Sequence, residues 1–260
     1  MAYRSALLGL GSSGGAGSPA TPDLGYLPLY CHRAVAEHAL LLWLALLRRL
    51  PRQTRQFATF QRDGLTGLEC AGKVLVVVGV GHIGGEIAAI GAALGMRVLG
   101  VDRSTDRPGI AYVTREEALP QADIIVCAMD LNASNRGYFS TDVIAGTKRG
   151  ALFINISRGE LSPSTVLLAA LEAGQLGGVG LDVYDHEAVL AGALRAAPPP
   201  ASIADAEAQA AIALSRRDDV ICTPHNAFNS LEAVERKSAH SVQTLLHQRQ
   251  SGRFLWPAPG

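Results

Sequence analysis

The sequence predicts an α/β protein in which a doubly wound parallel sheet is covered by helices on both faces. The main observation is an alternation that begins after residue 72, where short apolar runs rich in β-branched residues take turns with stretches of helical periodicity. Runs that are apolar throughout are typical of strands buried on both faces, as in parallel sheets with helical crossovers. A second observation is the length of 260 residues, which allows one large domain or two small ones.

The first predicted element is a helix over residues 34–50, which Pro51 ends. Between residues 39 and 47 this helix has no polar stripe, and we therefore expect it to be buried on all sides. The apolar run is far shorter than the ~20 residues that cross a bilayer, so it is interpreted as a buried helix.

The later elements alternate in type along the chain. The first of them are a strand at 73–80, a helix at 83–94 and a strand at 97–102. Further strands are expected at 123–128, 151–155, 178–182 and 220–222, with helices at 140–146 and 162–174. Residues 188–219 interrupt this order. They contain three consecutive prolines, Pro198, Pro199 and Pro200, followed by an alanine-rich, helical stretch. This segment is therefore predicted to be an excursion between two strands.

Three regions follow from this pattern. Residues 9–22 are dominated by Gly, Ser, Ala, Thr and Pro, a composition that buries little apolar surface, so residues 1–30 are expected to form a disordered head. Residues 31–235 are expected to form one domain that contains the sheet and its leading helix, and residues 236–260 a C-terminal helix and tail.

The composition narrows the class of function. The chain has 23 basic and 23 acidic side chains, which gives no reason to expect a nucleic-acid or membrane partner and fits an enzyme of small molecules. The four cysteines show neither a C-x-x-C pair nor regular spacing, so no metal site and no disulfide framework is expected and the default location is the cytoplasm. The apolar stretch near the start is shorter than the core of a secretory leader, which disfavours export.

A glycine motif joins the first of these strands to the next helix. Gly79, Gly81 and Gly84 form G-x-G-x-x-G around His82 and Ile83. In this motif the glycines permit a tight turn, close approach of a pyrophosphate and packing of helix on strand, and the phosphate lies at the helix N-terminus.

An acidic residue strengthens the prediction of a Rossmann-like dinucleotide site. Asp102 closes the next strand about 20 residues further on, where a carboxylate accepts hydrogen bonds from the adenosine ribose. NAD is therefore the favoured cofactor. NADP stays an alternative, because Arg103 next to Asp102 is able to contact a 2′-phosphate.

Three further segments come in order after this motif: residues 155–159 (NISRG), 181–187 (LDVYDHE) and 223–228 (TPHNAF). Together with the glycine motif they resemble the D-isomer-specific 2-hydroxyacid dehydrogenases, from about residue 30 to residue 257. The resemblance implies an NAD-dependent oxidoreductase that transfers a hydride between nicotinamide and a small 2-hydroxy acid/2-oxo acid pair.

The resemblance assigns a role to each of three polar residues. Arg158 is similar to the arginine that binds the substrate carboxylate, His225 to the general acid/base and Glu187 to the carboxylate partner of that histidine. The chemistry requires these residue types, because a guanidinium grips a carboxylate with two bonds and a carboxylate favours the charged imidazole. Each residue also lies just beyond a predicted strand end, where open α/β sheets bind ligands.

The resemblance also places Ile156 and Ser157 along the cofactor. Asp182 is similar to a residue on the nicotinamide side, while a purely structural role as a loop cap is an equally open interpretation. Asp185 and His186 beside Glu187 suggest a metal site with His225, but no third ligand stands at metal-site spacing.

The chain departs from the family pattern at its start. Family members carry about a hundred residues of flavodoxin-like substrate domain ahead of the cofactor domain, whereas some thirty residues precede the first helix here. The substrate domain is thus expected to be mostly absent, which predicts NADH binding with slow turnover.

The resemblance further implies a homodimer around the first helix. Two other functions stay open: a non-catalytic NAD(H)-binding interaction protein and a truncated, weakly active copy. The identity of the 2-hydroxy acid is not predicted.

Overall fold

The computed structural model describes residues 24–196 and 203–257. Its described part contains a seven-stranded sheet in the order β3-β2-β1-β4-β5-β6-β7, in which all neighbouring strands run parallel. The strands are β1 (Val74–Val78), β2 (Arg97–Val101), β3 (Ala111–Tyr112), β4 (Ile124–Cys127), β5 (Ala151–Asn155), β6 (Leu176–Leu181) and β7 (Val220–Cys222). The predicted doubly wound α/β fold is confirmed.

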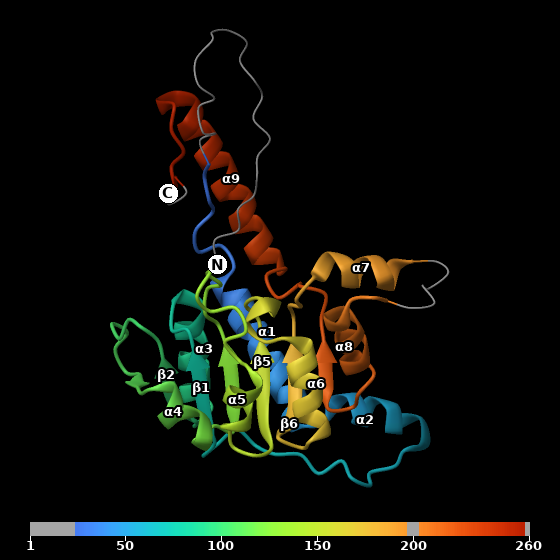
Figure 1. Cartoon of the computed structure of the whole chain (residues 1–260). Helices are drawn as coiled ribbons and strands as arrows, with labels where there is room; N and C mark the ends of the chain where they lie inside the picture. The colour runs from blue at the N-terminus through green and yellow to red at the C-terminus, as the bar shows by residue number, and fades with distance from the viewer. Residues whose placement is uncertain (1–23, 197–202, 258–260) are drawn as a thin grey trace. The chain divides into compact units, whose positions relative to one another are not determined.

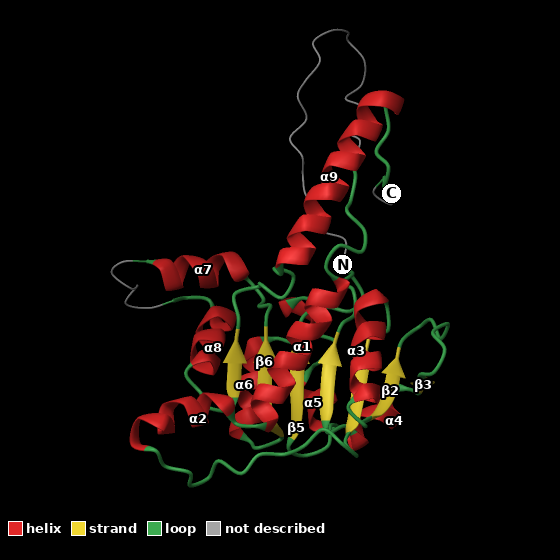
Figure 2. Ribbon diagram, turned by 180° about the vertical axis from the view of Figure 1, so that it is seen from behind, coloured by secondary structure: helices red, strands yellow, loops and turns green. Residues whose placement is uncertain are grey.

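Helices cover both faces of this sheet. In the sheet-bearing unit they are α1 (His32–Leu47), α2 (Leu50–Gln56), α3 (His82–Ala93), α4 (Arg115–Ala118), α5 (Thr141–Ala145), α6 (Ser164–Glu172), α7 (Glu187–Arg195) and α8 (Ala206–Ser215). Helices α5 and α6 lie in front of the sheet in Figure 1, and α1 and α3 lie in front of its other face in Figure 2. The central strands are therefore screened from solvent, which explains why their sequences are apolar throughout.

The strand order reverses between β1 and β4. From β1 the chain winds outward through β2 and β3, and it then returns to place β4 on the other side of β1. In open α/β sheets, ligands generally bind beyond the carboxyl ends of the strands at such a reversal. The glycine turn follows β1 and therefore lies at the reversal.

Two expectations for the first helix were wrong. The helix ends at Leu47 rather than residue 50, and Pro51 lies in the first turn of α2, where its missing N–H costs nothing. Burial is also incomplete: Leu42 and Trp43 are at most 1% exposed, whereas Leu41 is 54% exposed. An apolar stripe of α1 is thus open in the single chain.

The excursion between β6 and β7 is built from helices α7 and α8. Asp205 caps α8 by accepting a hydrogen bond from the amide of Ala208, 2.8 Å away. Pro198, Pro199 and Pro200, and residues 1–23 of the disordered head expected over residues 1–30, lie outside the described residues. Residues 24–30 of that head are described, and the amide of Tyr26 donates to the carbonyl of Trp256 at 2.9 Å. Strand β3 and helix α4 were not predicted, because two and four residues are too few to show a period.

The chain divides into two compact units. One comprises residues 33–227 and holds the whole sheet. The described part of the other comprises residues 24–32 and 228–257, with the helix α9 (Leu231–Ser251). Within this second unit Nε of Arg236 donates to the carbonyl of Tyr30 at 2.9 Å. The boundaries expected at residues 31 and 235 stay a prediction. Among the described helices, none combines the length and the apolar character needed to span a membrane.

Candidate active site

A histidine and a carboxylate meet beyond the carboxyl ends of β6 and β7. Nδ1 of His225 lies 2.8 Å from Oε2 of Glu187, and the two side chains are 23% and 39% exposed. Oε1 of Glu187 accepts a hydrogen bond from the amide of Tyr184 at 3.1 Å. A carboxylate only accepts hydrogen bonds, so the pairing assigns the Nδ1 proton to the imidazole and turns Nε2 toward other partners.

The charge of Glu187 is stabilised by its surroundings. Burial raises the pKa of this carboxyl, but the hydrogen bond and charge of His225, the Tyr184 amide and the Arg158 guanidinium outweigh it and lower the pKa below its usual value. Glu187 is therefore ionised over the whole neutral range. Arg158 is among the charges that lower this pKa, so its guanidinium lies within electrostatic range of Glu187.

Arg158 is presented by a tightly built turn after β5. Asn155, fully buried at the end of β5, donates from Nδ2 to the carbonyl of Arg158 at 2.8 Å and accepts the amide of Ser157 at 2.9 Å. A Cβ on Gly159 would lie 1.8 Å from the carbonyl carbon of Tyr184. This glycine therefore lets the Arg158 turn press against the loop that leads to Glu187.

Asp182 anchors the loop that carries His225. Its carboxylate is 1% exposed and accepts hydrogen bonds from the Thr223 hydroxyl at 2.6 Å and from the amides of Asn226 and Ala227 at 2.8 Å each. These contacts are those of a loop cap, one of the two interpretations left open by the sequence. The loop needs such an anchor because His225 has a left-handed backbone with φ 52°, which is costly for a side chain that carries a Cβ.

A second histidine supports this anchor and was missed by the sequence analysis. Nε2 of His38, on α1, lies 2.9 Å from Oγ1 of Thr223 and 3.6 Å from Oδ1 of Asp182. The Thr223 hydroxyl has one proton, and when it gives this proton to Asp182 it accepts one from His38. The sequence offered no signal for this contact, because no motif or spacing distinguishes His38 from other polar residues within a helix.

The glycine turn has the shape that a dinucleotide needs. Gly79 has φ 93°, and a Cβ there would lie 2.4 Å from the backbone of Met129, while a Cβ on Gly84 would lie 1.9 Å from the carbonyl oxygen of Gly79. Around Gly81, by contrast, a Cβ would meet nothing within 4 Å. The outer glycines therefore permit close packing, and the middle one leaves open space at the start of α3, where a pyrophosphate fits.

The other predicted cofactor residues follow β2, begin α3 or follow β5. Asp102 follows β2 and is exposed, and its carboxylate accepts hydrogen bonds from the amides of Val80 at 2.5 Å and Ser104 at 3.1 Å. His82 is the exposed first residue of α3 and Ile83 is half-buried. Ile156 is 1% exposed and Ser157 is 4% exposed, with the Ser157 hydroxyl bonded to the carbonyl of Met129.

One cation at the glycine turn was not predicted. Nε of Arg107 donates to the carbonyl of Val80 at 2.9 Å, and its Nη2 lies 3.3 Å from Nδ1 of His82. A positive charge against a phosphate-binding turn favours an anionic ligand. Arg107 stands in a loop between β2 and β3, where no spacing rule marks it.

Comparison with known proteins gives a consistent result. Residues 40–227 match the family described as D-isomer specific 2-hydroxyacid dehydrogenase, NAD binding domain. The chain is 33% identical over 167 residues to a D-lactate dehydrogenase of Escherichia coli, which covers 62% of this chain and 51% of the relative. It is 35% identical over 161 residues to a D-3-phosphoglycerate dehydrogenase of Bacillus subtilis, covering 59% of this chain and 31% of the relative.

A solved structure agrees with these sequence relatives. The D-lactate dehydrogenase of Aquifex aeolicus, complexed with NAD and lactic acid, superposes with a TM-score of 0.81 at 26% identity, covering 91% of this chain and 73% of the other. The chain thus spans about half the length of one curated relative named above and about a third of the other.

Proposed function

The chain belongs to the D-isomer-specific 2-hydroxyacid dehydrogenase family and carries its NAD-binding domain, and we propose that it transfers a hydride between NAD and a small 2-hydroxy acid/2-oxo acid pair. The observation that carries this proposal is the His225–Glu187 pair, 2.8 Å apart, and Arg158 is among the charges that act on Glu187. An acid/base group and a fixed cation together are what reduction of a 2-oxo acid demands.

Arg158 is proposed to bind the substrate carboxylate. A guanidinium donates two parallel hydrogen bonds to a carboxylate, which fixes the orientation of the acid as well as its position. The turn around Asn155 and Gly159 holds the backbone of Arg158 against the Glu187 loop. In this proposal the keto group of the bound 2-oxo acid faces His225.

His225 is proposed to give a proton to the keto oxygen during reduction and to take it back during oxidation. Negative charge develops on that oxygen as the carbonyl carbon is reduced, and a protonated imidazole stabilises it. Glu187 orients the ring through the hydrogen bond to Nδ1, and Nε2 is the nitrogen proposed to act on the substrate. Glu187 is therefore a positioning residue and His225 the catalytic one.

The glycine turn is proposed to hold the cofactor. Gly79, Gly81 and Gly84 admit the pyrophosphate, and Asp102 accepts hydrogen bonds from the adenosine ribose. When bound, NAD supplies or accepts the hydride. Arg107 adds positive charge at the same turn.

The exposed stripe of α1 supports a proposal of homodimer formation. Leu41 and Leu44 of α1 are 54% and 36% exposed, and apolar surface of this kind is stabilised by a second copy of the chain. Light scattering on the purified protein tests this, and a monomer at every concentration contradicts it.

The test of the function is an initial-rate assay of NADH oxidation with a panel of small 2-oxo acids. We expect measurable reduction of at least one acid and a loss of about 10²–10⁴-fold in His225→Gln, with NADH affinity nearly unchanged in a fluorescence titration. NADH binding without turnover of any acid, in the wild type as in the variant, instead favours the alternative of a non-catalytic NAD(H)-binding interaction protein.

A further inference from the structure

A cavity of about 600 Å³ opens at the amino ends of the strands. Its wall includes Lys73, Asp123, Gly150 and Asp219, which immediately precede β1, β4, β5 and β7. The catalytic residues follow the carboxyl ends of the same sheet. The cavity is therefore a separate site, and its volume lies within the roughly 300–1,000 Å³ of small-molecule pockets.

Each carboxylate in the wall of this cavity already has a cation. Oδ1 of Asp123 accepts Nζ of Lys148 at 2.7 Å. Asp219 is held by Arg217 through two hydrogen bonds of 2.8 Å. Asp218 pairs with Arg55.

Three cations in the wall have no carboxylate. Lys73 donates no hydrogen bond and forms no ion pair within the described residues, and it acts on Asp123 only at longer range. Nη1 of Arg49 reaches only the carbonyl of Gly64 at 3.3 Å, and Nη2 of Arg52 only the carbonyl of Asp63 at 3.4 Å. These long contacts to neutral acceptors leave most donors of the two guanidinium groups available.

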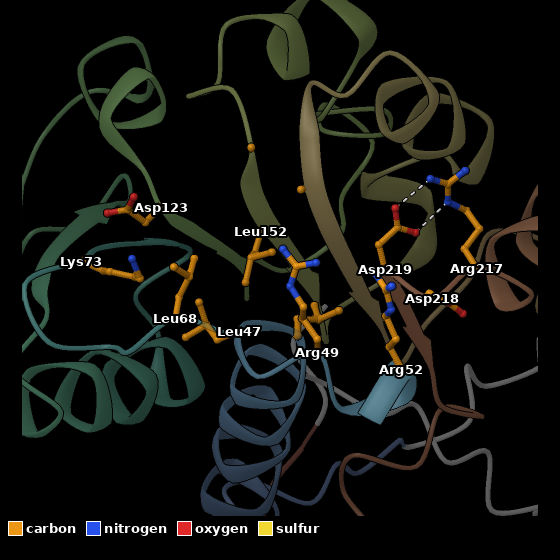
Figure 3. A pocket seen from close by; sticks show the side chains of 13 residues that line it. Leu47, Arg49, Arg52, Leu68, Lys73, Asp123, Leu152, Arg217, Asp218 and Asp219 are labelled. Atoms are coloured by element: carbon orange, nitrogen blue, oxygen red, sulfur yellow. Dashed lines mark hydrogen bonds and ion pairs between the residues drawn. The ribbon is translucent and has the colours of Figure 1, made fainter. Parts of the chain in front are cut away.

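The cations flank an apolar surface. Figure 3 shows Lys73 at one side of the pocket, the side chains of Leu47, Leu68 and Leu152 in the middle, and Arg49 and then Arg52 toward the other side. A ligand with one acidic group at each end and an apolar body between them matches this arrangement. A ligand with a single acidic group satisfies only one end.

We propose that this cavity binds a small organic dianion, with two carboxylate groups separated by a short apolar spacer. One carboxylate pairs with Arg49 and Arg52, the spacer covers Leu47, Leu68 and Leu152, and the second carboxylate pairs with Lys73. Arginine suits the first contact because its planar fork binds a carboxylate with two bonds, and lysine suits the second as a point charge.

Isothermal titration calorimetry on the full chain saturated with NADH tests the proposal with three probes of equal length. Adipate has two acidic groups, hexanoate has one and 1,6-hexanediol has none. We expect adipate to bind at least about tenfold more tightly than hexanoate, because it gains a second charge-assisted contact, and the diol to give no heat of binding. Equal affinities for the three probes overturn the proposal.

Variants locate the two ends. Lys73→Met removes the second contact, so it weakens adipate by about tenfold and leaves hexanoate unchanged, whereas Arg49→Gln and Arg52→Gln weaken both acids. Arg62→Gln, an exposed arginine in the neighbouring loop that does not line the cavity, is the matched control.

A final variant separates this cavity from the proposed catalytic site. Adipate binding persists in Arg158→Gln if the cavity holds the acid, and it disappears if the acid binds at Arg158. Loss of binding in Arg158→Gln, or full binding in Lys73→Met and Arg49→Gln, contradicts the assignment. Because the readout is heat rather than turnover, the result is independent of whether hydride transfer is observed.

Discussion

Nδ1 of His225 lies 2.8 Å from Oε2 of Glu187, although 38 positions separate the two residues in the chain. The parallel sheet brings them together, because β6 and β7 are neighbours and both residues follow carboxyl ends. The lowered pKa of Glu187 keeps its carboxylate charged well below neutral pH. At neutral pH the imidazole therefore always faces a negative charge.

Replacing this carboxylate is expected to slow 2-oxo acid reduction without weakening cofactor binding. Glu187→Gln puts a neutral amide in place of the charged acceptor 2.8 Å from Nδ1 of His225, so the ring loses the contact that orients it and kcat/KM falls by about 10²-fold. Initial rates and a fluorescence titration of NADH measure the two quantities, with the exposed Glu172→Gln as the control. An unchanged kcat/KM means that Glu187 does not position His225.

Arg158→Lys is expected to be severe despite the retained charge. An ammonium lacks the planar fork and forms a weaker, less oriented contact with a carboxylate, so kcat/KM falls by about 10²-fold while NADH affinity stays nearly unchanged. Initial rates and fluorescence titration measure the two quantities. The control for the loss of an arginine is Arg149→Lys. Arg149 lies at the amino ends of the strands, just before β5, and donates to the carbonyl of Ala173. A mild effect at Arg158 places the substrate carboxylate elsewhere.

Asp182→Asn is expected to destabilise the protein by about 1–3 kcal/mol. Both oxygens of Asp182 accept hydrogen bonds, and in either orientation the new amide turns a donor toward a donor. Urea denaturation gives the loss of stability, and kcat falls as well because the anchored loop carries His225. Asp63→Asn, an exposed residue, serves as the comparison. Wild-type stability with reduced kcat instead favours a direct role beside the nicotinamide.

Asp102 is expected to set the preference for NADH over NADPH. An exposed carboxylate at the adenosine ribose repels a 2′-phosphate, so the wild type binds NADH at least about tenfold more tightly, and Asp102→Ser narrows the difference. Fluorescence titration with both cofactors measures it, with Asp106→Asn as the control. Equal or tighter NADPH binding by the wild type contradicts the assignment and turns attention to Arg103 and Arg107.

The success of sequence prediction differs between the sheet and its loops. Strands β5 and β7 were predicted at their observed bounds, because a short run that is apolar throughout and is followed by polar residues is typical of a buried parallel strand. The proposed catalytic residues were found through motifs that follow such strands. His38 and Arg107 were not found, because their contacts reach across 185 and 27 positions and depend on tertiary packing. The left-handed turn at Arg49 was missed for a related reason, since arginine carries no preference for φ 53°.

The segment that positions Glu187 should respond to pH through its neighbour. His186 has a left-handed backbone at the start of α7, and its Nδ1 lies 2.6 Å from Oδ2 of Asp205, the cap of α8. The hydrogen bond to Asp205 and the charges of Asp185 and Asp205 raise the pKa of His186. The amide of Ala208 and the bond to His186 lower the pKa of Asp205.

These two directions define the pH window in which the pair stabilises the fold. A raised histidine pKa gives a contribution that is fully present below the unfolded value near 6.5 and is lost as pH rises through the folded value. A lowered aspartate pKa gives a contribution that is present above the unfolded value near 3.9 and is lost as pH falls through the folded value. Stabilisation by the pair is therefore greatest at mildly acidic pH.

His186→Asn tests this window. Asparagine tolerates the left-handed backbone but does not carry the imidazole charge. The Tm of the variant should therefore be lower than that of the wild type near pH 6 and equal to it above pH 9. The difference should be a few degrees at most, because the His186 side chain is 51% exposed and solvent screens the pair. Thermal unfolding at both pH values measures it, with His247→Asn on α9 as the control. A difference that is the same at pH 6 and pH 9 assigns the effect to packing and rules out the ion pair as its source.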